Sequence, residues 1–170
     1  MAFVNTQYDM ADLPVADDLV MEPLAAAYVK EVKTQQLIIW TPILLASMIP
    51  AVLTQISFLW ALPVFVSFLA ALISRLMIRK TQVKAVGLRE FDVAYQSGLF
   101  WRKTVIVPFN RVQHVEVSSG PLQRKFGLAT IKFFTAGGSK VDLKVDGLTA
   151  ERAEQMRAYI ATRIDHASLA

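Results

Sequence analysis

An uncharged stretch of 41 residues, from Thr34 to Ser74, constrains this chain more than any other feature. One helix crosses the hydrocarbon core of a membrane with about 20 apolar residues, so the stretch is twice as long as one crossing needs. The polar residues Thr54, Gln55 and Ser57 divide it near its middle. We therefore predict a two-helix transmembrane hairpin over residues 37–78, joined by a very short turn.

Three prolines inside the stretch bear on how these helices run. Pro42 is expected near the start of the first helix, where its missing N–H costs little, and Pro50 is expected to kink or end that helix. Pro63 falls in the first turns of the second helix. A shallow re-entrant hairpin and a buried helical pair of a soluble protein are the alternatives. Aromatic residues that favour membrane interfaces lie near the predicted ends, at Tyr28, Trp40 and Trp60.

Basic residues flank the hairpin on both sides, while its turn carries no charge. Lys30 and Lys33 precede it, and Arg75, Arg79 and Lys80 follow it. Because cytoplasmic flanks of membrane helices carry an excess of lysine and arginine, we expect both termini in the cytoplasm. The expected location is the cytoplasmic (inner) membrane of a bacterium.

The residues before the hairpin divide into two parts. Residues 1–22 carry five acidic and no basic side chains and show little periodicity, which is typical of a mobile tail. Residues 23–36 place Leu24, Tyr28 and Val32 at helical spacing, which predicts an amphipathic lead-in helix.

After Lys80 the hydrophobic period changes from that of a helix to two, the period of a strand. Strands are predicted at residues 89–96, 99–107, 111–117, 128–134 and 139–145, with a helical turn at 122–126. A final helix is capped by Thr149 and carries an apolar stripe at Ala153, Met156, Ile160 and Ile164. The fold class is therefore a membrane α-helical hairpin plus an α+β domain over residues 81–165, a small curved antiparallel sheet or barrel closed by the C-terminal helix.

One long motif in this domain has a family resemblance. Residues 98–130, GLFWRKTVIVPFNRVQHVEVSSGPLQRKFGLAT, and the turn at 135–138 closely resemble the bacterial pleckstrin-homology (PH)-like domain of YdbS-type membrane proteins. With the preceding hairpin, the resemblance covers roughly residues 20–165. It implies a PH-like barrel of about seven strands with a C-terminal helix, so one further strand is expected within residues 81–86. It also implies a domain that lies under the membrane, has no catalytic role and accompanies a larger membrane protein with several such domains.

Six motif residues are interpreted as determinants of the fold. The glycines suit positive φ or close backbone approach, the prolines restrict turns, and the arginine is expected to pair with Glu116 or to cap carbonyl groups. These residues are Gly98, Pro108, Arg111, Gly120, Pro121 and Gly127.

Two basic pairs next to aromatic residues are the candidate binding residues for lipid or a partner. Beside an anionic leaflet each such charge contributes about 1 kcal/mol of attraction. An ordinary solvated basic surface is the alternative interpretation. The candidates are Arg102, Lys103, Arg124 and Lys125, with Trp101, Phe126 and the neighbouring Phe100.

The sequence gives no sign of an enzyme. There is no cysteine for a thiolate nucleophile or metal site. His114 and Glu116 share a strand face, but no third ligand has a matching spacing, so a surface pair is expected. We expect no catalytic residues, metal, cofactor or nucleic-acid partner.

The leading hypothesis for function is a non-enzymatic scaffold or accessory subunit of a membrane protein complex. Its partner would be another membrane protein or a second copy of the chain. The alternative is a module that senses anionic membrane lipids. A small transporter is less favoured, because the two spans carry no intramembrane charge.

Overall fold

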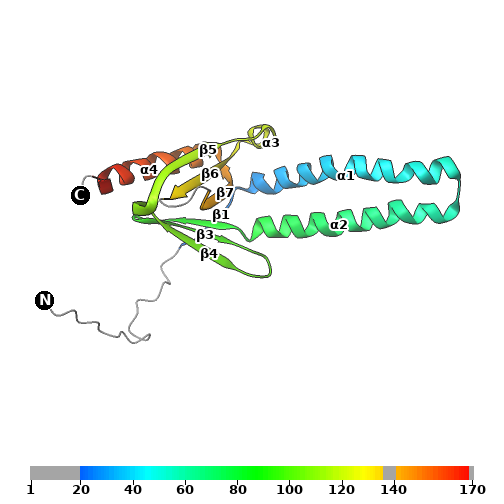
Figure 1. Cartoon of the computed structure of the whole chain (residues 1–170), viewed down its shortest axis with the longest axis horizontal. Coiled ribbons are helices and arrows are strands. Elements are labelled where there is room, and N and C mark those ends of the chain that lie inside the picture. The colour runs from blue at the N-terminus through cyan, green and yellow to red at the C-terminus, as the bar shows by residue number, and fades with distance from the viewer. Residues whose placement is uncertain (1–19, 136–140, 169–170) are drawn as a thin grey trace, which may run out of the picture.

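The structure of the protein is a computed structural model that describes residues 20–135 and 141–168. A long two-helix hairpin extends from one end of an α+β domain (Figure 1). The predicted acidic tail falls almost entirely on residues 1–19, which lie outside the described residues, as does the start of the strand predicted at 139–145.

The hairpin consists of α1 (Ala26–Thr54) and α2 (Ala61–Gln82), which pack side by side (Figure 1). At 1.5 Å per residue the helices measure about 43 Å and about 33 Å, enough for each to cross a hydrocarbon core about 30 Å thick. Few of their apolar side chains are buried, unlike those of a core helix in a soluble protein. The two predicted spans are therefore present as helices of membrane-crossing length.

The connection between the helices lies where the polar residues predicted it. α1 ends at Thr54, Gln55 adopts a left-handed conformation with φ 54°, and a 3₁₀ turn, η3 (Ser57–Trp60), leads into α2. Pro63 is the third residue of α2, where a missing N–H costs little. The expectation for Pro42 is wrong, because α1 begins at Ala26 and Pro42 lies in its interior.

Seven antiparallel strands form two sheets in the described part of the chain. The first sheet has the order β1 (Glu22–Pro23), β2 (Ala85–Leu88), β3 (Asp92–Ser97), β4 (Lys103–Pro108). A short turn, η4 (Phe109–Arg111), leads to the second, ordered β5 (Val112–Ser118), β6 (Leu128–Thr135), β7 (Leu143–Thr149). Among the described residues the two sheets do not close into one hydrogen-bonded barrel.

Four strand boundaries differ clearly from those predicted. The strand expected over residues 139–145 is β7, which begins at Leu143 and continues to Thr149. The strand expected over residues 99–107 begins only at Lys103, because residues 98–102 form a wide turn. The strand expected from Arg89 begins at Asp92, and the Arg89 N–H closes the preceding turn on the Asp92 carbonyl at 2.9 Å. The strand expected within residues 81–86 starts at Ala85, because α2 continues to Gln82.

The hydrophobic core lies between the sheets and under the C-terminal helix α4 (Ala150–Ser168). Thr149 caps this helix as predicted, since its Oγ1 accepts the Arg152 N–H at 3.2 Å. Ala153, Met156 and Ile160 form the buried stripe of α4, and the Ile164 side chain lies outside the described ones. The helix thus covers apolar surface that the sheets alone leave open.

A close contact joins the hairpin to the domain. Gly147 in β7 has φ +83°, and a Cβ atom there would lie 2.3 Å from the ring of Tyr28. The Ala25 N–H donates to the Gly147 carbonyl at 3.0 Å, and Lys84 Nζ donates to the Tyr28 hydroxyl at 3.0 Å. Tyr28 is therefore buried against the domain, not placed at a membrane interface, and the predicted lead-in helix is the continuous first part of α1.

Candidate membrane-facing surface

The turn between β3 and β4 projects beside the domain-proximal end of α2 (Figure 1). Gly98 opens it with φ +107°, and a Cβ atom there would lie 1.8 Å from the Trp101 carbonyl oxygen, so only glycine fits. At its tip Phe100 and Trp101 are 76% and 86% exposed and meet edge to face, with ring centroids 6.4 Å apart. Two large aromatic side chains thus point away from the core.

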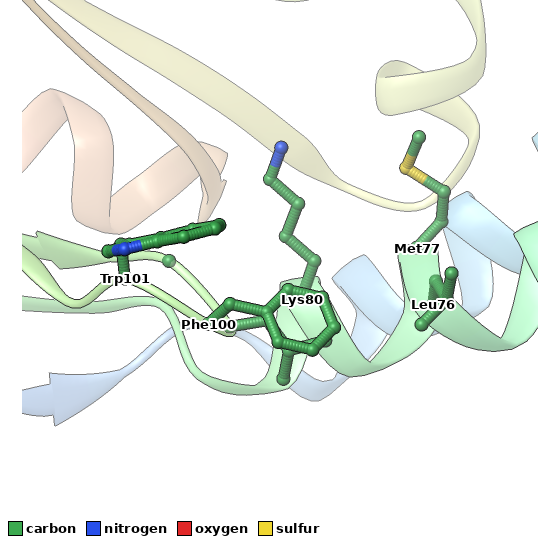
Figure 2. Close-up of a pocket in the computed structure, with 7 residues that line it drawn as sticks. Leu76, Met77, Lys80, Phe100 and Trp101 are labelled. Atoms are coloured by element: carbon green, nitrogen blue, oxygen red, sulfur yellow. The ribbon is translucent and has the colours of Figure 1, made fainter.

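The turn and α2 together enclose two apolar hollows. One, of 330 Å³, lies between Trp101 and the helix, and Figure 2 shows the Lys80 side chain projecting between Trp101 and Met77. The other, of 420 Å³, lies on the far side of Phe100 and is lined by Leu72, Arg75, Leu76, Arg79, Leu99 and Phe100. Because Leu72 belongs to the uncharged stretch, Phe100 reaches the depth at which that stretch ends.

Exposed positive charges surround these hollows. Arg102 and Lys103 leave the turn on its β4 side, and Arg75, Arg79 and Lys80 lie on the adjoining end of α2. None of the five forms an ion pair with another described residue. The surface combines apolar hollows with unpaired cations, the chemistry that suits a phospholipid headgroup above its acyl chains.

The second predicted basic pair lies elsewhere. Arg124 and Lys125 are exposed on the short helix α3 (Pro121–Lys125), which contacts α1, so the two pairs flank the hairpin on opposite sides (Figure 1). Phe126 follows α3 and is half-buried. The structure therefore brings Trp101, Arg102 and Lys103 together, but it separates them from Arg124, Lys125 and Phe126.

The three residues contributed by α2 are absent from the set of binding candidates predicted from sequence. In the sequence, Arg75, Arg79 and Lys80 serve only as indicators of orientation. Their position directly after the uncharged stretch is the available signal, since a helix leaving a membrane presents such residues at headgroup depth. The turn at 98–102 lies beside these three residues because of the geometry of the sheet, which the sequence pattern does not reveal.

The structural motif residues have mixed outcomes. Gly98 and Gly127 adopt positive φ, whereas Gly120 has φ −72° and a Cβ atom there would meet nothing closer than 3.9 Å, so its predicted need for glycine is wrong. Pro121 begins α3, and Pro108 ends β4 opposite Asp92. Glu116 pairs with Lys132 at 2.8 Å, not with Arg111, which is exposed.

A buried polar cluster lies where the domain packs against α1. Glu31, on the part of α1 before the uncharged stretch, is buried, and its Oε2 has no hydrogen-bond partner among the described residues. Burial, and then the nearby Asp146 carboxylate, raise the pKa of Glu31. Burial, followed by Asp146 and Glu31, raises the pKa of Tyr28 to about 12. The contact between α1 and the domain therefore favours the neutral forms of Tyr28 and Glu31.

Among the described residues, His114 and Glu116 belong to no metal-binding group. The His114 ring stacks on Phe134 at 4.1 Å between centroids, as in a cross-strand surface pair. No group of three or more acidic or histidine side chains with metal-binding geometry occurs among the described residues.

An apolar helical hairpin joined to antiparallel sheets and a covering C-terminal helix defines a class: membrane proteins with a PH-like α+β domain at the base of a hairpin. The chain belongs to the bacterial PH domain family, whose model matches residues 25–164. It is also similar to the UPF0699 transmembrane protein YdbS of Bacillus subtilis (strain 168), with 40% identity over 74 residues.

The match to this relative is partial. It covers 44% of this chain and 45% of the relative, so the chain matches less than half of that protein's length. No solved structure matches the chain significantly. The comparisons therefore support a YdbS-type membrane protein with a bacterial PH domain.

Proposed function

We propose that the chain is a non-enzymatic membrane-anchored module whose PH-like domain binds anionic phospholipid through the β3–β4 turn and the adjoining end of α2. The observation that carries this proposal is the placement of Phe100 and Trp101. Both are largely exposed, and Phe100 lies at the depth of Leu72 and Leu76 on α2. Their exposure is unfavourable in water and favourable at a membrane interface.

The charges near the turn select the lipid class. Five exposed cations from the turn and α2 meet the headgroup layer, and each contributes about 1 kcal/mol near an anionic leaflet. The cytoplasmic leaflet of a bacterial inner membrane carries such lipids. This placement agrees with the basic flanks of the hairpin, so both termini lie on the cytoplasmic side in this proposal.

The depth of the turn tests the proposal directly. Since the chain has no cysteine, a fluorophore can be attached through Trp101→Cys in the full chain, with Asn110→Cys at the other end of β4 as the control. In vesicles containing phosphatidylglycerol, brominated acyl chains should quench the label at 101 strongly and the label at 110 weakly. Equal quenching at both positions would refute the insertion of the turn.

A second function, as a scaffold or accessory subunit, is favoured by a different set of side chains. Phe91, Leu88 and Ile106 are 71%, 43% and 52% exposed on the first sheet. Phe91 precedes β3, whereas the lipid-facing turn follows β3, so Phe91 lies at the end of the domain away from the membrane. Exposed apolar side chains remote from lipid suit a protein partner, either a larger membrane protein with several PH-like domains or a second copy.

Crosslinking tests the scaffold function. A photoreactive amino acid at Phe91 should capture one defined partner or a second copy in intact cells, and the same group at Lys125, exposed on α3 beside α1, should not. Purification in mild detergent should also retain that partner in a fixed ratio. Recovery of a lone monomer, with no crosslink from position 91, would count against this function.

A further inference from the structure

A groove runs along the seam between α1 and α2, on a different face of α2 from the lipid-facing turn. Its volume is 390 Å³, within the range of about 300–1,000 Å³ typical of small-ligand sites. Its α2 wall includes Ala70, Ala71 and Ser74, whereas the turn faces Leu72 and Leu76. Ser74 and Leu76 point to nearly opposite sides of the helix, so the groove is separate from the surface described above.

Hydrogen bonding fixes the orientation of the one amide in this groove. The oxygen Oε1 of Gln36 accepts from Trp40 Nε1 at 2.9 Å and from Ser74 Oγ at 3.4 Å. Because the indole N–H only donates, the amide must present its oxygen there. Its NH₂ group then keeps two donors, which have no acceptor among the described residues.

A second donor lies at the same end. Lys33 lines the cytoplasm-proximal mouth of the groove, is exposed, and forms no ion pair with a described residue. Beyond Gln36 the walls are apolar, with Leu37 and Leu44 on one side and the two alanines on the other. The groove therefore has donors at its headgroup end and hydrocarbon along its length.

We propose that this groove holds one anionic phospholipid of the cytoplasmic leaflet. Lys33 would bind the phosphate, the Gln36 amide would donate to an ester carbonyl, and one acyl chain would lie between Leu37, Leu44 and the alanines. The Gln36 amide lies beside Lys33 at the headgroup end of the groove, so a lipid ester oxygen lies within reach of its free donors. A second copy that packed here through its uncharged stretch would fill the apolar part without supplying an anion to Lys33, so the charge favours lipid.

Native mass spectrometry of the full chain in mild detergent with added phosphatidylglycerol tests this inference. Ala71→Leu fills the groove, and Ala46→Leu is its control on an exposed position of α1. We expect one tightly retained phosphatidylglycerol per chain, and occupancy about tenfold lower in the Ala71→Leu variant, because the leucine side chain takes the space of the acyl chain. Ala46→Leu should match the parent.

Lys33→Gln is a second test variant, which removes the charge without filling the groove. It should abolish the preference for phosphatidylglycerol over phosphatidylcholine, while Lys30→Gln, one turn earlier and equally exposed, should keep it. Unchanged lipid retention in both groove variants would overturn the proposal. A changed oligomeric state with unchanged lipid would overturn it in favour of a helix-docking face. Neither result affects quenching at position 101, so the two proposals fail independently.

Discussion

Single residues determine how the hairpin meets the domain, and Gly147 is the tightest of these contacts. Its φ of +83° and the Tyr28 ring, 2.3 Å from a Cβ position, both exclude a side chain. Gly147→Ala should lower the free energy of unfolding by about 2–4 kcal/mol, from backbone strain and overpacking together. Gly127→Ala is the control, since Gly127 also has positive φ but open space around it. Its cost should be only about 1–2 kcal/mol, measured by denaturant unfolding in micelles.

The buried carboxyl group of Glu31 predicts a dependence of stability on pH. Burial and Asp146 raise its pKa in the folded protein above the ordinary 4.5. The folded state therefore binds the proton more tightly, so this group favours folding below pH 4.5 and loses that contribution as pH rises through the raised pKa. Glu31→Gln should flatten this slope and raise the unfolding midpoint at pH 7. Parallel pH profiles for the two proteins would contradict the assignment.

Local chemistry is predictable at this scale, and cross-strand pairing is not. The Thr149 cap follows from residues within one turn, and so does the helical turn predicted at 122–126, which is α3 shifted by one residue. The partner of Glu116 is Lys132 because β5 and β6 align the two residues directly. That register depends on the whole sheet, so sequence spacing cannot choose between Arg111 and a distant lysine.

At the scale of elements, the sequence predicts the hairpin, most strands and the final helix, but it misplaces the β3–β4 turn. Leu99, Phe100 and Trp101 are as apolar as strand residues, so the pattern extends the strand over them. They are apolar because they face α2 and the proposed lipid surface, not the core. Hydrophobicity alone does not distinguish these two environments, and the candidate site is therefore predicted only in part.

The C-terminal helix gives the clearest prediction for an element. Ile160 is fully buried in its apolar stripe, so Ile160→Ala should destabilise the protein by about 2–5 kcal/mol. Val141→Ala, at a 40% exposed position, should cost less than about 1 kcal/mol. Denaturant unfolding followed by far-ultraviolet circular dichroism measures both. Similar losses would mean that α4 does not cover the core.

The two basic pairs should differ in their effect because they lie on different elements. Arg102→Gln with Lys103→Gln should reduce quenching at position 101 in phosphatidylglycerol vesicles, by removing about 2 kcal/mol of attraction beside the turn. Arg124→Gln with Lys125→Gln, on the α1 side, should change it less. In phosphatidylcholine vesicles neither double variant should differ from the parent. A loss that is independent of lipid charge would contradict the electrostatic role.

At the scale of the whole molecule, the short turn of the hairpin lies at one end and the domain at the other (Figure 1). The contacts among Tyr28, Lys84 and Gly147 attach the domain to both helices. The depth of the turn at 98–102 in the membrane is therefore fixed by the position of the hairpin. Membrane insertion of the hairpin therefore sets the depth at which the domain would make the proposed lipid contact. Both lipid sites proposed above require that the hairpin crosses the bilayer with the domain on the cytoplasmic side.

Single-cysteine labelling in intact cells with a membrane-impermeant maleimide measures this arrangement most directly. We predict that Ile56→Cys, between the two helices, reacts from outside the cell, whereas Asn110→Cys reacts only after the membrane is opened. Labelling of Asn110→Cys from outside, or recovery of the chain in the soluble fraction without detergent, would contradict it.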